Sequence, residues 1–195
     1  MIHTDGELGN LQTVVTETRE NVFGKDQTAA FPRKVDGYWK IVEERLRLKT
    51  NLFRAGITCK VHIFIDSLPN PNTDPDIEKQ LVEYTLQDLI NKGFPAYRLI
   101  DEFRTAGATV HGTEDPKLLV KELEYQEESK SRFMRGEEID VIKGKELLEA
   151  RDKAIIECVH KKISDGETAI IFIGRLHNVI GPLSKPPYNF KIIKL

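Results

Sequence analysis

The feature that most constrains the fold of this chain is a regular alternation of short β-rich runs with longer helical stretches. Residues 60–66 and 168–173 are rich in Val, Ile and Phe, a composition typical of buried strands. Residues 76–92 and 143–164 instead carry apolar side chains at helical spacing. Because parallel strands need long crossover connections, which are usually helical, this order predicts an α/β fold with a mostly parallel sheet and helices on both faces.

Other segments fit the same order. Residues 108–112 predict a short strand, and residues 95–107 predict a helix that stops at a glycine. Asp115 and Pro116 are the N-cap and the first residue expected of a helix that runs to about residue 135. The remaining expected elements are a strand end at 1–4, helices at 8–22 and 37–53, a mobile polar loop at 24–34 and a last strand at 190–195.

The length of the chain favours one domain. Its 195 residues are enough for a core without disulfide or metal staples, so we expect a single α/β domain over residues 1–195. Only Met1 and Ile2 precede His3, so the chain either begins at the margin of the sheet or has lost its first strand. A homo-oligomer that completes the sheet would be one way to compensate for such a loss.

Charge and hydropathy argue against several classes of protein. The chain carries 29 Lys and Arg against 31 Asp and Glu, and its net charge of −2 argues against a general nucleic-acid binder. No apolar run approaches the roughly 18 residues of a membrane span, and the polar N-terminus is unlike a signal peptide. Cys59 and Cys158 have apolar neighbours and are expected to be buried. We therefore expect a cytoplasmic protein with no membrane contact.

Polar side chains follow each of the expected strands. His3 follows the first strand, Asp66 the second, Glu114 the third, and Arg175 and His177 the fourth. Ligands of open parallel sheets bind beyond the carboxyl ends of the strands, so we expect these residues to share one edge of the sheet. Imidazoles, carboxylates and a guanidinium are the groups that bind a divalent metal or carry out general acid–base chemistry.

Each histidine also has a plainer interpretation. His62 and His111 lie inside expected strands, where histidines are usually structural, and His160 ends a helix, where a cation suits the helix dipole. Asp66 has a plain interpretation too, as the start of a turn. His177 differs from these residues because it follows an apolar run and a glycine, where the backbone approaches a ligand easily.

A charged pair interrupts the apolar stripe of the helix expected at 143–164. Arg151 and Asp152 stand between apolar pairs on the side of the helix that should face the core. A charge in that position is costly unless it is paired or reaches a site. The pair is therefore either a buried ion pair or a device that orients a ligand or a catalytic group.

The C-terminal part of the chain resembles a known family. A helix with Arg151-Asp152, an apolar strand at 170–173 and the Gly-x-x-His sequence at 174–177 are similar to the C-terminal half of the TraB/PrgY and Tiki group. That group is related to ChaN-like haem-binding and erythromycin-esterase-like proteins. Glu114 resembles the acidic position that the family places between its two histidine motifs. The resemblance implies a metal-dependent hydrolase, peptidase-like in its substrate.

The first functional hypothesis is accordingly a metal-assisted hydrolase that acts on a small molecule or a peptide. A bound divalent ion would lower the pKa of a water molecule and so generate a nucleophile near neutral pH. Glu114 or Asp66 is the alternative general base, and an arginine would hold an anionic or carbonyl oxygen. We expect Glu114, His177 and Arg151 to act in catalysis, Arg175, Asp152 and Asp66 to bind the ligand, and His3, Glu114 and His177 to hold the metal.

Two other hypotheses stay open. A non-catalytic binding or regulatory module would bind haem or use Arg151 and Arg175 to bind a small anion, with the histidines only shaping the pocket. A defective family member would act as an interaction protein. Other enzyme classes lack a motif, because the chain contains no G-x-S-x-G, Walker A, G-x-G-x-x-G or H-E-x-x-H sequence.

Overall fold

The computed structural model describes residues 20–21, 24–50, 60–70, 75–174, 176–188 and 190. The chain divides into two compact units. One, here called the helical unit, takes in the described residues before Thr58 together with Tyr84–Ala108. The other, the sheet unit, takes in those of Cys59–Glu83 and Thr109–Lys194. Among the described residues, no helix combines the length and the apolar composition that crossing a membrane requires.

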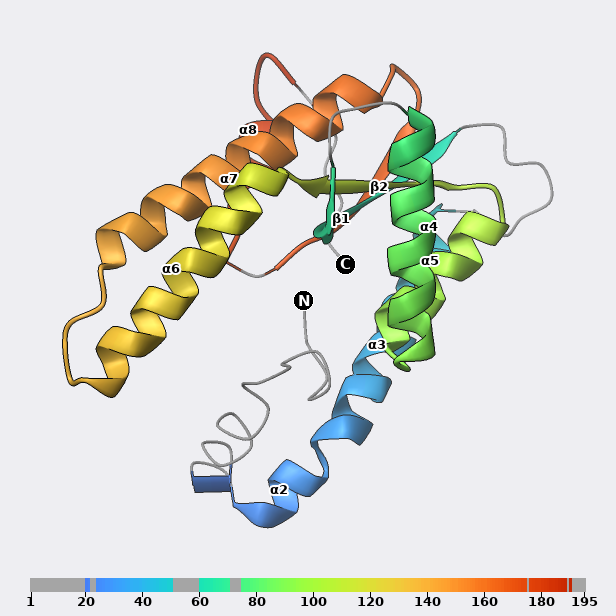
Figure 1. The fold of residues 1–195 in the computed structure, drawn as a ribbon. Coiled ribbons are helices and arrows are strands. Elements are labelled where there is room, and N and C mark those ends of the chain that lie inside the picture. Colours follow the sequence, from blue (N-terminus) through green and yellow to red (C-terminus); the bar gives the residue numbers. More distant parts are fainter. Residues whose placement is uncertain are drawn as a thin grey trace. The chain divides into compact units, whose positions relative to one another are not determined.

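The sheet unit contains three described strands. They are β1 (Val61–Pro69), β2 (Thr109–Glu114) and β3 (Thr168–Phe172), all parallel and in the order β2-β1-β3 (Figure 1). In the central strand Ile63, Phe64 and Ile65 are all fully buried, although successive side chains point to opposite faces. Both faces of β1 are therefore covered, which is why its sequence is a continuous apolar run. The predicted α/β fold with a parallel sheet is confirmed.

Helices α6 (Pro116–Met134) and α7 (Val141–Lys162) lie side by side and antiparallel in the sheet unit (Figure 1). The C-terminal half of α7 buries Ile155 and Val159 against Phe64 of β1, together with Leu183 of the short helix α8 (Ile180–Leu183). Each fully buried apolar side chain of this size contributes roughly 1.5–3 kcal/mol. The charged N-terminal half of α7 is thereby held beside the end of β2.

Two aspartates start these helices. Asp115 accepts hydrogen bonds from the N–H groups of Lys117 and Leu118 at 2.8 and 3.2 Å, so it is the N-cap predicted for α6. Asp140 caps α7 by accepting a hydrogen bond from the N–H of Lys143 at 3.0 Å. Asp115 is thus engaged in the fold, immediately after the carboxyl end of β2.

The helical unit contains α2 (Lys25–Ala29), α3 (Phe31–Thr50) and α5 (Pro95–Thr105). Helix α4 (Pro75–Asn91) begins in the sheet unit, and its residues from Tyr84 onward belong to the helical unit. On α3 the buried side chains of Val35, Trp39 and Leu46 repeat at helical spacing. Arg47 of α3 also donates a hydrogen bond to Glu102 of α5 at 2.6 Å.

The segment 24–34, expected to be a mobile loop, is instead largely helical, because α2 and the start of α3 fall within it. The buried Val35 supplies the reason, since it extends the apolar stripe of α3 by one turn before Trp39 and lies two residues before the predicted start at Gly37. The other predicted bounds agree with the structure to within about three residues. The elements expected at 1–4, 8–22 and 190–195 lie almost wholly outside the described residues, as does Cys59, whereas Cys158 is buried as predicted.

Candidate functional site

The carboxyl edge of the sheet gathers most of the predicted residues. Asp66 lies in β1, Glu114 ends β2, and His177 follows β3. Because the three strands are parallel, their carboxyl ends meet at one edge, where sites of α/β proteins are found. We call Asp66, Glu114, His177 and two residues of α7, Arg151 and Asp152, the carboxyl-edge site. The other two predicted residues, His3 and Arg175, lie outside the described residues.

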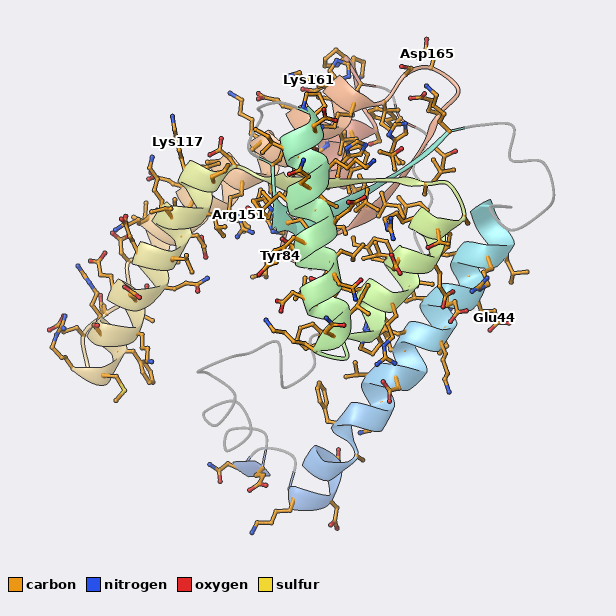
Figure 2. The ribbon with its side chains drawn as sticks, turned by 45° about the vertical axis from the view of Figure 1, so that its right-hand side comes forward. Glu44, Tyr84, Lys117, Arg151, Lys161 and Asp165 are labelled. Carbon is orange, nitrogen blue, oxygen red and sulfur yellow. The ribbon has the colours of Figure 1, made fainter. Side chains whose placement is uncertain are left out.

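Glu114 and Arg151 form a two-pronged ion pair. The guanidinium of Arg151, labelled in Figure 2, donates from Nη2 to Oε1 of Glu114 at 2.6 Å and from Nε to Oε2 at 3.1 Å. Glu114 is only 2% exposed, so this pair compensates a carboxylate that would otherwise be buried alone. Burial raises the pKa of the Glu114 carboxyl above its ordinary value, and the Arg151 hydrogen bonds oppose that rise.

The pairing bears on the role predicted for Glu114. Both of its carboxylate oxygens accept hydrogen bonds from Arg151 and the residue is only 2% exposed, so a metal ion or a water molecule reaches them only if the surrounding side chains move. A bidentate arginine–carboxylate pair is also among the strongest polar contacts in proteins. The metal-ligand role of Glu114 therefore stays a prediction, and it would require Arg151 to withdraw.

Asp152 fixes the histidine of the site. Its Oδ1 lies 2.6 Å from Nδ1 of His177, and its Oδ2 accepts the backbone N–H of Asn178 at 2.9 Å. An ionised carboxylate can only accept, so Nδ1 carries a hydrogen, and in the neutral ring the lone pair is then on Nε2. A carboxylate behind a histidine in this way orients the ring and makes the other nitrogen more basic. Asp152 thus leaves Nε2 as the nitrogen of His177 that faces other groups of the site.

Asp66 faces Nε2 of His177. Its Oδ2 is 3.7 Å from Nε2 of His177 and also accepts the backbone N–H of Gly174 at 2.6 Å. A Cβ at position 174 would lie 3.3 Å from the same Asp66 oxygen and 3.4 Å from the ring of His177. The glycine of the Gly-x-x-His sequence therefore permits the close approach of carboxylate, backbone and imidazole.

An irregularity in β1 accompanies the position of Asp66. Ile65 pairs with Gly112, whereas Pro69 pairs with Glu114, so β1 carries extra residues between these two pairs. Such a bulge bends a strand and re-aims its side chains. The bulge requires a glycine at position 112, because a Cβ there would clash with the carbonyl oxygens of Leu68 and Pro69. The bulge was not predicted from the sequence.

The site is enclosed but not sealed. The side chain of His177 is 6% exposed, that of Asp66 13% and that of Asp152 12%. Asp66 and Nε2 of His177 are separated by about the distance expected between two ligands of one ion with bonds of roughly 2.0–2.2 Å. Within the described part of the chain, however, no three His, Cys, Asp or Glu side chains are grouped so as to hold a metal ion. The described residues therefore supply two candidate donors.

The structure changes which residues of the site belong together. Arg151 and Asp152, adjacent in sequence, serve two separate contacts, one with Glu114 and one with His177. The sequence indicated that the pair needed partners but not which ones. The backbone contacts of Gly174 and Asn178 were not predicted, and only the glycine gave a signal in the sequence. Comparison of the chain with protein-family models, with curated proteins and with solved structures yields no match.

Proposed function

We propose that this protein is a hydrolase whose reaction centre is His177 together with Asp66 and Asp152, assisted by a divalent cation. One observation carries the proposal: Asp152 binds Nδ1 of His177 at 2.6 Å, while Nε2 faces Asp66 at 3.7 Å. This arrangement supports acid–base chemistry because one carboxylate fixes the ring and its tautomer, and the free nitrogen points at a second carboxylate.

His177, Asp152 and Asp66 have different roles in the activation of a water molecule. In the absence of a cation, Nε2 of His177 accepts the proton of the attacking water, and Asp152 stabilises the imidazolium that results. A cation bound at Nε2 would replace this proton acceptor, because it would lower the pKa of the water molecule directly. Asp66, held by the N–H of Gly174, is close enough to contact the same water molecule and orient it. The pair Glu114–Arg151 lies outside this sequence of events and holds the end of β2 to α7.

The same atoms suit a divalent cation. Nε2 of His177 and the carboxylate of Asp66 are the donor types that zinc and related ions prefer, with Asp152 in the supporting position behind the histidine. A bound cation would lower the pKa of water and polarise the substrate. His3, which lies outside the described residues, is the further ligand that our sequence hypothesis provides. The resemblance to the TraB/PrgY and Tiki group favours the same activity on a small molecule or a peptide.

The alternative of a small-anion binding module has weaker support. Its two arginines would have to meet an anion, but Arg151 is already paired with Glu114 at 2.6 Å. Arg175 lies outside the described residues. The carboxylates of Asp66 and Asp152 would in addition repel an anion at this edge of the sheet.

The test is a hydrolysis assay on esters, phosphoesters and peptides with and without Mn²⁺ or Zn²⁺, alongside metal content measured by mass spectrometry. We expect His177→Ala and Asp66→Asn to lose about 100-fold or more in activity and to lose bound metal. His160→Ala is the control, because His160 is an exposed histidine on α7. A folded His177→Ala variant with full activity and full metal content would contradict the proposal.

A further inference from the structure

A second pair of histidines lies elsewhere in the sheet unit. His62 of β1 and His111 of β2 are on the same sheet face as Phe64, and Nδ1 of His62 is 2.9 Å from Nε2 of His111. Their rings are nearly parallel, with an angle of 11° between the planes. Both side chains are largely buried, at 11% and 12% exposure. The carboxyl-edge site makes no use of them.

Each histidine also has a carboxylate at its outer nitrogen. Nε2 of His62 is 3.3 Å from Oε2 of Glu167, which lies just before β3. Nδ1 of His111 is 3.5 Å from Oε1 of Glu78, which lies in the first turn of α4. The four side chains therefore form a row with three gaps: Glu167 to His62, His62 to His111, and His111 to Glu78.

Counting hydrogens across this row gives a definite number. Every gap lies between two atoms that carry lone pairs, so each is favourable only when it contains a hydrogen. Two neutral imidazoles bring two ring hydrogens, which leaves one of the three gaps empty. The gap at Nε2 of His62 is the candidate for the empty one, because this nitrogen is buried and makes no hydrogen bond within the described residues. A third hydrogen fills the row, whereas a fourth would set two N–H groups against each other.

We propose that His62 and His111 together form a binding site for a single additional proton, and that the pair acts as a pH-sensitive junction of the sheet unit. The pair carries one positive charge when the site is filled. It resists a second proton, because the inner gap of 2.9 Å has room for only one hydrogen.

The charges around the pair agree with this count. The backbone N–H of Ser164 lowers the pKa of Glu167, which keeps a negative charge beside His62, although Lys60 lies 3.6 Å from the same carboxylate. On the other side Lys162 binds both oxygens of Glu78 at 2.6 and 2.7 Å.

The second proton is disfavoured on the His111 side. Burial, then Lys162 and His62, lower the pKa of His111 to about 4, against the opposing effect of Glu78. His111 is therefore the member of the pair that stays neutral.

The junction joins four elements. His62 belongs to β1, His111 to β2, Glu78 to α4 and Lys162 to the last turn of α7. Loss of the shared proton leaves an imidazole lone pair facing a carboxylate, and gain of a second places two cations side by side. The first change weakens the contact between β1 and the residue before β3, and the second weakens the contact of β2 with Glu78 of α4, to which Lys162 of α7 is bound. The pair therefore makes the sheet unit responsive to pH.

The experiment is ¹⁵N NMR of the histidine rings in the full chain, titrated from about pH 9 to about pH 4. We expect the pair to take up only one proton as the pH falls, and to take up a second only near pH 4. Between these two steps His111 is neutral and His62 is charged. His160, exposed on α7, is a histidine outside the row and is followed in the same spectra. The proposal is overturned if both rings become doubly protonated together near the ordinary histidine pKa, or if both stay neutral throughout.

A variant separates the proton site from ordinary histidine titration. Glu167→Gln removes the carboxylate that needs the proton, so the uptake midpoint of the pair should fall by about one pH unit, a ten-fold weaker binding of the proton. Glu157→Gln, an exposed carboxylate on α7, is the matched control and should leave the midpoint unchanged. Equal midpoints in the two variants would also overturn the proposal.

Discussion

Two groups of histidine and carboxylate side chains stand on the same parallel sheet, and they differ in what each imidazole nitrogen meets. At the carboxyl-edge site Asp152 holds one nitrogen of His177, and the other faces Asp66 across 3.7 Å. In the second group, the inner nitrogens of His62 and His111 meet each other at 2.9 Å. The first arrangement leaves Nε2 of His177 available to a substrate or a cation. In the second, the inner nitrogens of both histidines are already hydrogen-bonded to each other.

The carboxylates at the carboxyl edge show the same contrast. Glu114 is neutralised by a bidentate arginine and is almost fully buried, while Asp66 receives a backbone N–H and faces a histidine. A strand-end carboxylate is thus either part of the scaffold or part of the reaction centre that we propose, depending on whether an arginine is already paired with it. The predictions below test this division, beginning with the largest expected effect.

Removing the guanidinium from the Glu114–Arg151 ion pair should have the largest effect on stability. Arg151→Met leaves Glu114 buried without a partner, and we expect the free energy of unfolding to fall by about 3–5 kcal/mol. Urea denaturation measures this loss. Lys153→Met, an exposed position on the same helix, is the control and should change stability by less than about 0.5 kcal/mol. A loss below about 1 kcal/mol in Arg151→Met would show that Glu114 is not held as the structure indicates.

The histidine pair should make stability depend on pH. The pKa of His111 is lowered to about 4 in the folded protein, below its value of 6.5 in the unfolded chain. Folding therefore favours the neutral ring, and this contribution is fully present above pH 6.5 and is lost as pH falls toward 4. We expect a loss of up to about 3 kcal/mol over that interval.

Denaturation of the wild type and of His111→Gln at several pH values isolates this contribution. Other groups titrate in the same interval, so only the difference between the two proteins is informative. The variant should show the flatter dependence on pH. If the two proteins lose stability in parallel between neutral and acid pH, then the lowered pKa of His111 is not the source of the pH dependence.

Disconnecting the reaction centre from α7 should have an intermediate effect. Asp152→Asn replaces an ionised acceptor of two hydrogen bonds, and we expect a loss of about 1.5–3 kcal/mol, as for hydrogen bonds to charged groups. The same change should lower hydrolysis because the tautomer of His177 is no longer fixed. Circular dichroism and the assay together distinguish a local from a global change. A variant with normal activity would show that Asp152 has only a structural role.

The smallest effect is expected where the Gly-x-x-His sequence approaches Asp66. Gly174→Ala places a Cβ 3.3 Å from Oδ2 of Asp66, and we expect the neighbour to shift by a few tenths of an ångström at a cost of about 1 kcal/mol. Gly166→Ala would not serve as a control, because that residue has a φ of +84°. Gly37→Ala is the comparison: nothing lies within 4 Å of its Cβ position, and it should raise stability by about 0.5–1 kcal/mol because alanine favours the interior of helix α3. Equal stability in both variants would show that the contact at 174 is not tight.

The sequence predicted those features that depend on local pattern. The apolar run around Phe64, the cap at Asp115 and the helical spacing of α7 each reflect short-range chemistry, and the structure confirms all three. The placement of Asp66 and Glu114 at one edge followed from a general rule of parallel sheets.

Features that depend on distant partners could not be predicted in this way. Arg151 meets Glu114 across 37 positions of the chain, and no local pattern specifies which carboxylate it selects. His62 and His111 are 49 positions apart, and only the register of β1 against β2 brings them together. The bulge after Ile65 likewise arises from strand pairing. Sequence therefore located the edge of the sheet but not the pairing within it.

The most direct test of the central claim is a Zn²⁺ titration followed by ¹⁵N NMR of all the histidine rings in the full chain. The account predicts that Nε2 of His177 shifts on addition of Zn²⁺ while its Nδ1 stays protonated against Asp152. It also predicts that the inner nitrogens of His62 and His111 do not respond. A response confined to His62 and His111, with His177 unchanged, would contradict the assignment of His177 as the reactive histidine of the carboxyl-edge site.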